Sequence, residues 1–147
     1  MLKLLLSLMF LITLASAKPL PYTLENLKKL NLYYVDRSGL FSKKEQQEIK
    51  KHIKSRLQAS GFDLHADDPS TLVVKIQTID IDDSVVAYIA LLVGEEVITK
   101  RDGNIETMAL TYQQSDFLEL DDPEIDIKEV VYRLLEEFLQ LYSEDME

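Results

Sequence analysis

Two stretches of the chain carry apolar residues at the spacing of an α-helix. In the first, Ile49, Ile53 and Leu57 recur about once per turn. Ser42 and Glu45 precede this stretch and have the spacing of a capping box, in which each side chain satisfies a free backbone amide of the other residue. Gly61 follows it and is the residue type that most often ends a helix. The sequence therefore predicts a helix from about residue 43 to residue 60.

The second helical pattern begins after Asp121 and Asp122, where Pro123 suits the first turn. Its wide apolar face consists of Ile127, Val130, Val131, Leu134, Leu135, Phe138, Leu141 and Tyr142. We expect Leu134 and Phe138 to face a sheet. The acidic tail over residues 144–147 lies at the negative end of the helix dipole, so we expect it to fray.

Alternating or β-branched apolar residues predict four strands. These are Lys29–Asp36, Thr71–Ile81, Val85–Thr99 and Ile105–Tyr112. The third begins with the apolar run Val85–Val93, which predicts burial on both faces, although a helix over Val86–Leu92 is an alternative. A helical turn over Leu24–Leu27 and a brief strand over Phe62–His65 are further expectations.

The third and fourth strands are predicted to form a hairpin, because Asp102-Gly103 between them favours a tight turn. On the fourth strand we expect Met108, Leu110 and Tyr112 to share one face. Phe117–Leu120 is expected to extend this strand beyond a bulge.

The predicted order is β-α-β-β-β-α. It favours an α+β fold in which two helices pack on one face of an antiparallel-rich sheet of about four strands. The segment Leu57-Gln-Ala-Ser-Gly61-Phe62, an acidic loop and Leu72–Gln77 resemble the corresponding part of small bacterial envelope domains. These include the lipoprotein partners of lipopolysaccharide assembly and curli-secretion-type domains. The resemblance implies a role in partner binding or assembly, but the chain lacks the lipidated cysteine that those families usually carry.

Residues 1–17 have the pattern of a secretory leader, with Lys3, the apolar run Leu4–Leu14 and the small residues Ala15-Ser-Ala17. We expect cleavage after Ala17, which leaves residues 18–147 as a single α+β domain that does not span a membrane. The chain has no cysteine and no Asn-x-Ser/Thr site, so a bacterial periplasm suits it better than a eukaryotic exterior.

The formal charge of −10 argues against general binding of nucleic acid or of anionic membranes, because both need a positive field. Without cysteine, and with two histidines, the chain has no sulfur ligands for a metal and few nitrogen ligands. Asp80, Asp82 and Asp83, and the group His65, Asp67 and Asp68, supply oxygen or nitrogen atoms to loops, but neither completes a recognised cation site. We therefore expect no cofactor, no metal site and no catalytic residues. A hydrolase that uses paired carboxylates is the least favoured alternative.

One helix differs from the acidic background, because the stretch from residue 43 to residue 56 contains six basic side chains. Lys50, Lys51 and Lys54 are candidates for a docking surface that takes an acidic partner or an anionic headgroup. The alternative is a solvated helix face whose later bases suit the negative end of the dipole.

We expect a non-catalytic periplasmic domain that binds an envelope protein or a lipid-linked component. The long apolar third strand would supply a sheet edge or a groove for the partner. The alternative function is a carrier of a small apolar ligand, held between sheet and helices by Tyr88, Met108, Tyr112 and Phe138.

Overall fold

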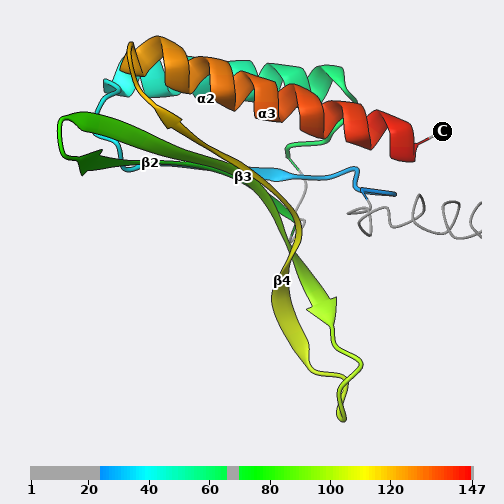
Figure 1. Ribbon diagram of the computed structural model, residues 1–147. Helices are drawn as coiled ribbons and strands as arrows, with labels where there is room; N and C mark the ends of the chain where they lie inside the picture. The colour runs from blue at the N-terminus through cyan, green and yellow to red at the C-terminus, as the bar shows by residue number, and fades with distance from the viewer. Residues whose placement is uncertain (1–23, 66–69, 147) are drawn as a thin grey trace, which may run out of the picture.

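A computed structural model describes residues 24–65 and 70–146 and has the predicted α+β fold. Two helices lie side by side on one face of a four-stranded sheet (Figure 1). The helices are α2 (Lys43–Ala59) and α3 (Pro123–Asp145), and the strands are β1 (Asn31–Asp36), β2 (Thr71–Ile81), β3 (Ser84–Ile98) and β4 (Glu106–Glu119). The predicted leader and its cleavage site lie outside the described residues.

The strands follow one another across the sheet in the order β1-β2-β3-β4. β1 and β2 are parallel and are joined through α2, whereas β2, β3 and β4 form an antiparallel meander. The predicted order of elements and the antiparallel-rich sheet are therefore confirmed. Within the described residues, no helix is long and apolar enough to cross a membrane.

The core lies between the helices and the sheet. Ile49, Ile53 and Leu57 of α2 are fully buried, as is the apolar stripe of α3 that includes Leu134 and Phe138. The Phe138 ring meets the Tyr112 ring of β4 edge-on, with their centroids 5.2 Å apart. This contact confirms that Leu134 and Phe138 lie on the sheet-facing side of α3.

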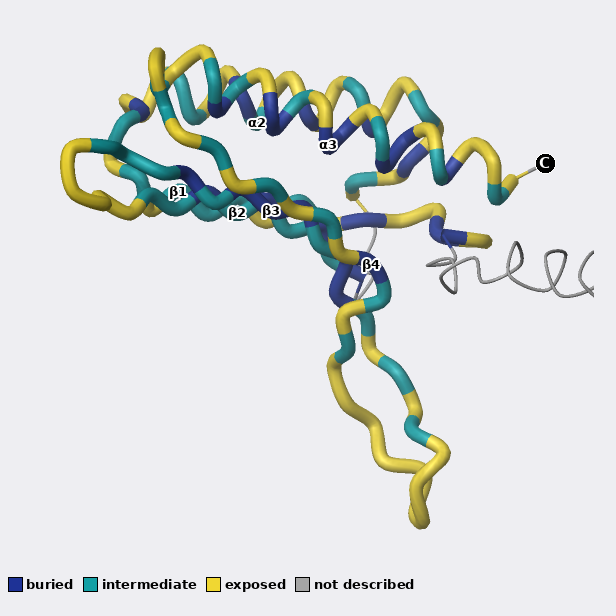
Figure 2. Tube along the Cα trace, in the orientation of Figure 1, coloured by how far each residue is buried: buried dark blue, intermediate teal, exposed yellow. Residues whose placement is uncertain are grey.

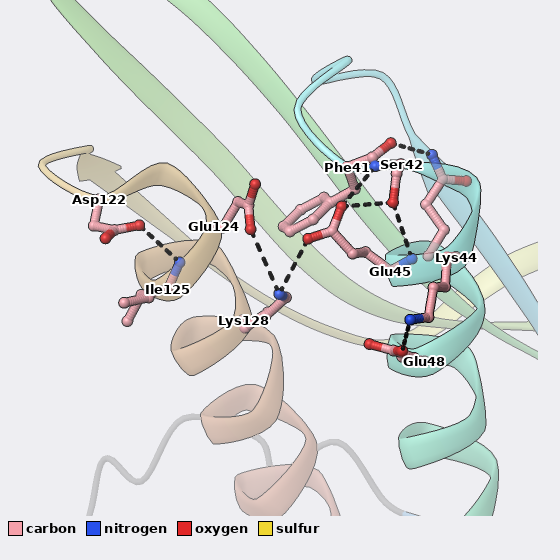
Figure 3. Close-up of polar contacts among 10 residues, drawn as sticks. Phe41, Ser42, Lys44, Glu45, Glu48, Asp122, Glu124, Ile125 and Lys128 are labelled. Atoms are coloured by element: carbon pink, nitrogen blue, oxygen red, sulfur yellow. Dashed lines mark hydrogen bonds and ion pairs between the residues drawn. The ribbon is translucent and has the colours of Figure 1, made fainter.

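The first turn of α2 has the predicted capping box (Figure 3). The Glu45 amide donates to the Ser42 hydroxyl oxygen at 3.3 Å, and the Ser42 amide donates to the Glu45 carboxylate at 2.9 Å. The Ser42 hydroxyl also donates to that carboxylate, and this bond is the main reason that the pKa of Glu45 is lowered to about 2. Lys128 of α3 lies between Glu45 and Glu124 and ties the two helix starts together.

Replacing Ser42 with alanine should lower the free energy of unfolding by about 1 kcal/mol at neutral pH, because free amides of the first turn lose their acceptor. Glu45 has a lower pKa in the folded protein than its ordinary 4.5, so its contribution is complete above about pH 4.5 and is lost as the pH falls toward about 2. Ser42→Ala should weaken this acid dependence. Urea unfolding at several pH values measures both effects. Ser55→Ala, at an exposed position within α2, is the control, and equal stability of the two variants would contradict the capping role.

The end of β3, the beginning of β4 and the turn between them form an arm, residues 94–110. This arm projects from the sheet on the side away from the helices (Figure 1). The pairing register shifts where the arm leaves the sheet: Val93 pairs with Tyr112, but the next residue, Gly94, pairs with Leu110. Thr111 is thus an extra residue, which makes a β-bulge and bends the hairpin.

The bulge overturns one prediction about the faces of β4. Neighbouring residues of a strand point to opposite sides, so the partners of Val93 and Gly94 also lie on opposite sides of the ribbon. Tyr112 therefore faces the helices, while Leu110 and Met108 face the other way. The prediction assumed strict alternation along the sequence, which puts Met108, Leu110 and Tyr112 on one face. It failed because the extra residue is visible only in the pairing with β3.

Three other expectations change. Phe62–His65 forms only an isolated bridge, in which Asp63 pairs with Lys29. The acidic tail does not fray at Asp145, because α3 continues to this residue and its carboxylate accepts the Leu24 amide at 2.6 Å. The first half of β3 is covered by helices on one face only. On the other face Ala90 is buried, but Tyr88 and Leu92 on either side of it are half-buried, so the predicted burial on both faces holds only in part.

Candidate functional site

The face of the sheet opposite the helices carries no covering element among the described residues (Figure 2). In the middle of β2 and β3 the helix-facing side chains are buried, whereas most residues of the opposite face are half-buried or exposed; Ala90 and Gly94, which have small or no side chains, are the buried ones on β3. This uncovered face is rich in apolar side chains. It includes Tyr33, Val73, Ile79, Ile81, Val86, Tyr88, Leu92 and Phe117.

The clearest feature of this face is a hollow beside two stacked aromatic rings. Tyr88 and Phe117 are cross-strand partners whose ring centroids lie 4.7 Å apart. The Lys75 ammonium lies 5.6 Å from the centroid of the Tyr88 ring. A hollow of about 510 Å³ is bounded by these two rings, by Ile79 and by a rim of uncharged polar side chains. The remaining lining residues are Gln77, Thr78, Gln113 and Ser115.

The arm continues the same apolar face. Its pairs place Gly94, Glu96 and Ile98 on one side with Leu110, Met108 and Glu106, and this side follows on from Tyr88 and Leu92. Ile98, Met108 and Leu110 are 65%, 61% and 57% exposed. The arm bends away from the helices (Figure 1), and the alternation along β3 carries the uncovered face of the sheet onto this side of the arm.

We call the uncovered face of the sheet and this side of the arm together the open apolar surface. Ten large apolar residues are exposed among the described residues, and seven of them lie on it. They are Tyr33, Ile79, Ile81, Phe117, Ile98, Met108 and Leu110. Scattered exposure would place them on all sides of the molecule, so this concentration marks a surface suited to binding.

The structure separates the four residues predicted to line one ligand pocket, which are Tyr88, Met108, Tyr112 and Phe138. Tyr88 and Met108 lie on the open apolar surface, whereas Tyr112 is buried beneath α3. Burial, with a smaller effect of Glu137, raises the pKa of Tyr112 to about 12. The Tyr112 and Phe138 rings pack on each other and fill the space between sheet and helix where the ligand pocket was predicted.

The prediction that the third strand leaves a free edge is wrong for the body of the sheet. β3 pairs with β2 from Ser84 to Gly94 and with β4 along the other side. The sheet edges belong to β1 and β4 instead. The apolar composition of β3 is that of a central strand. Its exposed face contributes Tyr88 to the hollow, and the strand supplies no sheet edge there.

The lysines predicted to form a docking surface do lie together. Lys50, Lys51 and Lys54 line one shallow depression of about 490 Å³ on the outer side of α2, with Gln47, Ser55 and Gln58. Arg56 differs, since it faces α3 and binds the Glu136 carboxylate with two hydrogen bonds of 2.7 and 2.6 Å. These bonds lower the pKa of Glu136 and raise that of Arg56.

Sequence comparison does not connect these surfaces to a known family. The chain matches no family model and no curated protein. Within residues 24–65 and 70–146, no three histidine or acidic side chains gather as a metal site would require. Of the two acidic loops that were weighed as cation sites and not favoured, one includes Asp67 and Asp68, which lie outside the described residues. In the other, Asp80 and Asp82 are exposed near the β2–β3 turn.

Sequence reasoning missed Tyr33, Ile79, Leu110 and Phe117 as surface residues. Each continues the apolar alternation of its strand, which is also the pattern of a core position. The available signal was the excess of apolar residues on both faces of β2, where Ile79 and Ile81 follow the buried series Leu72, Val74 and Ile76.

Proposed function

We propose that this protein is a non-catalytic, exported domain that binds another protein of the cell envelope on its open apolar surface. The concentration of exposed apolar side chains on this one continuous surface carries the proposal. The secretory pattern of residues 1–17 and the absence of cysteine support export to a periplasm.

The surface suits a protein partner for two reasons. Aromatic residues and methionine are enriched at the centres of protein interfaces, and Tyr88, Phe117 and Met108 supply them here. The hollow next to Phe117 gives a partner's side chain a place to insert, which is how interface residues with large energetic contributions are seated.

Photo-crosslinking in the living cell tests this proposal. A photoreactive amino acid at position 117 or 108 should yield a discrete crosslinked product with another envelope protein. The same amino acid at Gln140, which is exposed on α3, should not yield it. Phe117→Asp combined with Leu110→Asp should remove the product formed at position 108 without unfolding the protein, as measured by circular dichroism. Equal products at positions 117 and 140, or an unchanged product in the double variant, would contradict the proposal.

The hollow also supports a second candidate, a carrier of a small apolar ligand. Its volume of about 510 Å³ lies in the range of small-molecule sites, and its apolar wall with a polar rim is typical of them. This position differs from the predicted one, because the hollow lies on the face opposite the helices. A ligand that copurifies with the wild type but not with Phe117→Asp would favour the carrier, provided that no protein is crosslinked.

A further inference from the structure

The lysine patch, formed by Lys50, Lys51 and Lys54, has no acidic partner among the described residues. Ion pairs that involve α2 lie elsewhere on the helix: Arg56 binds Glu136, Lys44 lies near Glu48, and Lys128 of α3 reaches Glu45. The Lys50 ammonium instead lies 5.2 Å from the centroid of the Tyr34 ring. Three like charges therefore share one depression without an ion pair to any acidic side chain of the residues that the structure describes.

This arrangement is unusual for so acidic a chain. The whole sequence has 26 acidic and 16 basic side chains, so acidic residues were available to pair with the patch. The other polar residues in the depression, Gln47, Ser55 and Gln58, are uncharged and can donate hydrogen bonds. The depression thus presents cations and neutral donors without a carboxylate, which is the chemistry that recognises an anionic oxygen group.

We propose that the lysine patch binds the phosphate-bearing headgroups of an anionic lipid bilayer. Each lysine held near such a bilayer strengthens binding about fivefold, and three together on the order of a hundredfold. The acidic residues elsewhere oppose this attraction weakly, because charges are screened over about 8–10 Å at physiological salt. Three acids on α2 or beside it are already engaged by other bases, since Glu45 pairs with Lys128, Glu136 with Arg56 and Glu48 with Lys44.

Two observations favour a bilayer over an acidic protein. The patch contains lysine, which is depleted at protein interfaces, whereas arginine and aromatic residues are enriched there. In addition, none of the large apolar residues that the structure exposes lies on α2, so the patch lacks the apolar centre that a protein interface needs. A lipid headgroup layer requires neither.

The patch and the open apolar surface lie on different sides of the molecule. α2 belongs to the helix layer, while the open apolar surface lies beyond the opposite face of the sheet (Figures 1 and 2). A bilayer bound at α2 thus leaves the arm and the hollow free for a partner. The lipid proposal does not depend on the identity of that partner.

Vesicle flotation tests the proposal with the protein purified from the expressing cell. Vesicles of equal parts phosphatidylcholine and phosphatidylglycerol should bind the protein, and vesicles of phosphatidylcholine alone should not. The combined substitution Lys50→Glu, Lys51→Glu and Lys54→Glu should weaken binding on the order of a hundredfold or more, and added salt should weaken binding by the wild type. Replacing the same three lysines with arginine should preserve it.

A matched variant separates the patch from the net charge. Lys28, Lys29 and Lys100 are exposed outside α2, and their replacement by glutamate changes the net charge by the same amount. This variant should retain most of the binding, and circular dichroism should show both triple variants folded. Failure of the wild type to bind anionic vesicles, or equal loss in the two glutamate variants, would overturn the proposal. Binding of polyglutamate but not of the vesicles would assign the patch to an acidic protein instead.

Discussion

Replacing Phe138 with alanine should lower the free energy of unfolding by about 3–5 kcal/mol. The ring is fully buried in α3, where it meets Tyr112 edge-on and stacks against Phe62 at a centroid distance of 5.9 Å. Removing it takes apolar surface out of the core and leaves a cavity that the rigid helix and sheet cannot close. Urea unfolding monitored by circular dichroism gives the difference from the wild type.

The control for this prediction lies on the same helix. Ile125 is 54% exposed in the first turn of α3, and Ile125→Ala should change the free energy of unfolding by less than about 0.5 kcal/mol. If Phe138→Ala unfolded at the wild-type urea concentration, the assignment of the sheet-facing side of α3 would be wrong.

A negative charge on β3 should have opposite consequences at two adjacent positions. Ile89 is fully buried beneath the helices, and Ile89→Asp should cost more than about 5 kcal/mol, because it removes core packing and buries an unpaired carboxylate. Since domains are stable by about 5–15 kcal/mol, this variant should be largely unfolded. Tyr88 lies on the uncovered face, so Tyr88→Asp should cost within about 2 kcal/mol and remain folded.

This pair of variants also tests the structural basis of the proposed function. Circular dichroism and urea unfolding of the purified variants distinguish a folded protein from an unfolded one. A folded Ile89→Asp or an unfolded Tyr88→Asp would show that the helices cover the other face of the sheet. The open apolar surface would then have to be abandoned.

The features that the sequence predicted well depend on neighbouring residues. Ser42 and Glu45 mark the start of α2 because the capping interaction spans three residues, and Asp122 and Pro123 mark the start of α3 for a similar reason. Gly61 has a φ of 92° directly after the C-cap residue, as the expected helix stop requires. Such signals are complete within a few residues and need no information about the rest of the chain.

The features that could not be predicted depend on pairing between distant segments. Thr111 looks like any other strand residue, and its role as the extra residue of a bulge appears only from the partners of Val93 and Gly94 on β3. Because of this one extra residue, the Tyr112 side chain lies in the core and the Met108 side chain lies on the surface. An apolar residue at an alternating position also does not reveal whether a helix covers it, which is why Phe117 was not recognised.

The order in which the strands pair has a consequence for how the chain folds. β2 and β3 are linked through Asp82 and Asp83 alone, so their hairpin closes a short loop, and β4 follows across the next turn. β1 instead pairs with β2 across α2, with Asn31 opposite Thr71, and the entropy lost in closing a loop rises with its length. We therefore expect the meander to form first and β1 to join it late. Under the export that we propose, which would proceed from the N-terminus, β1 is the first strand to cross the membrane and the last to be held in the sheet.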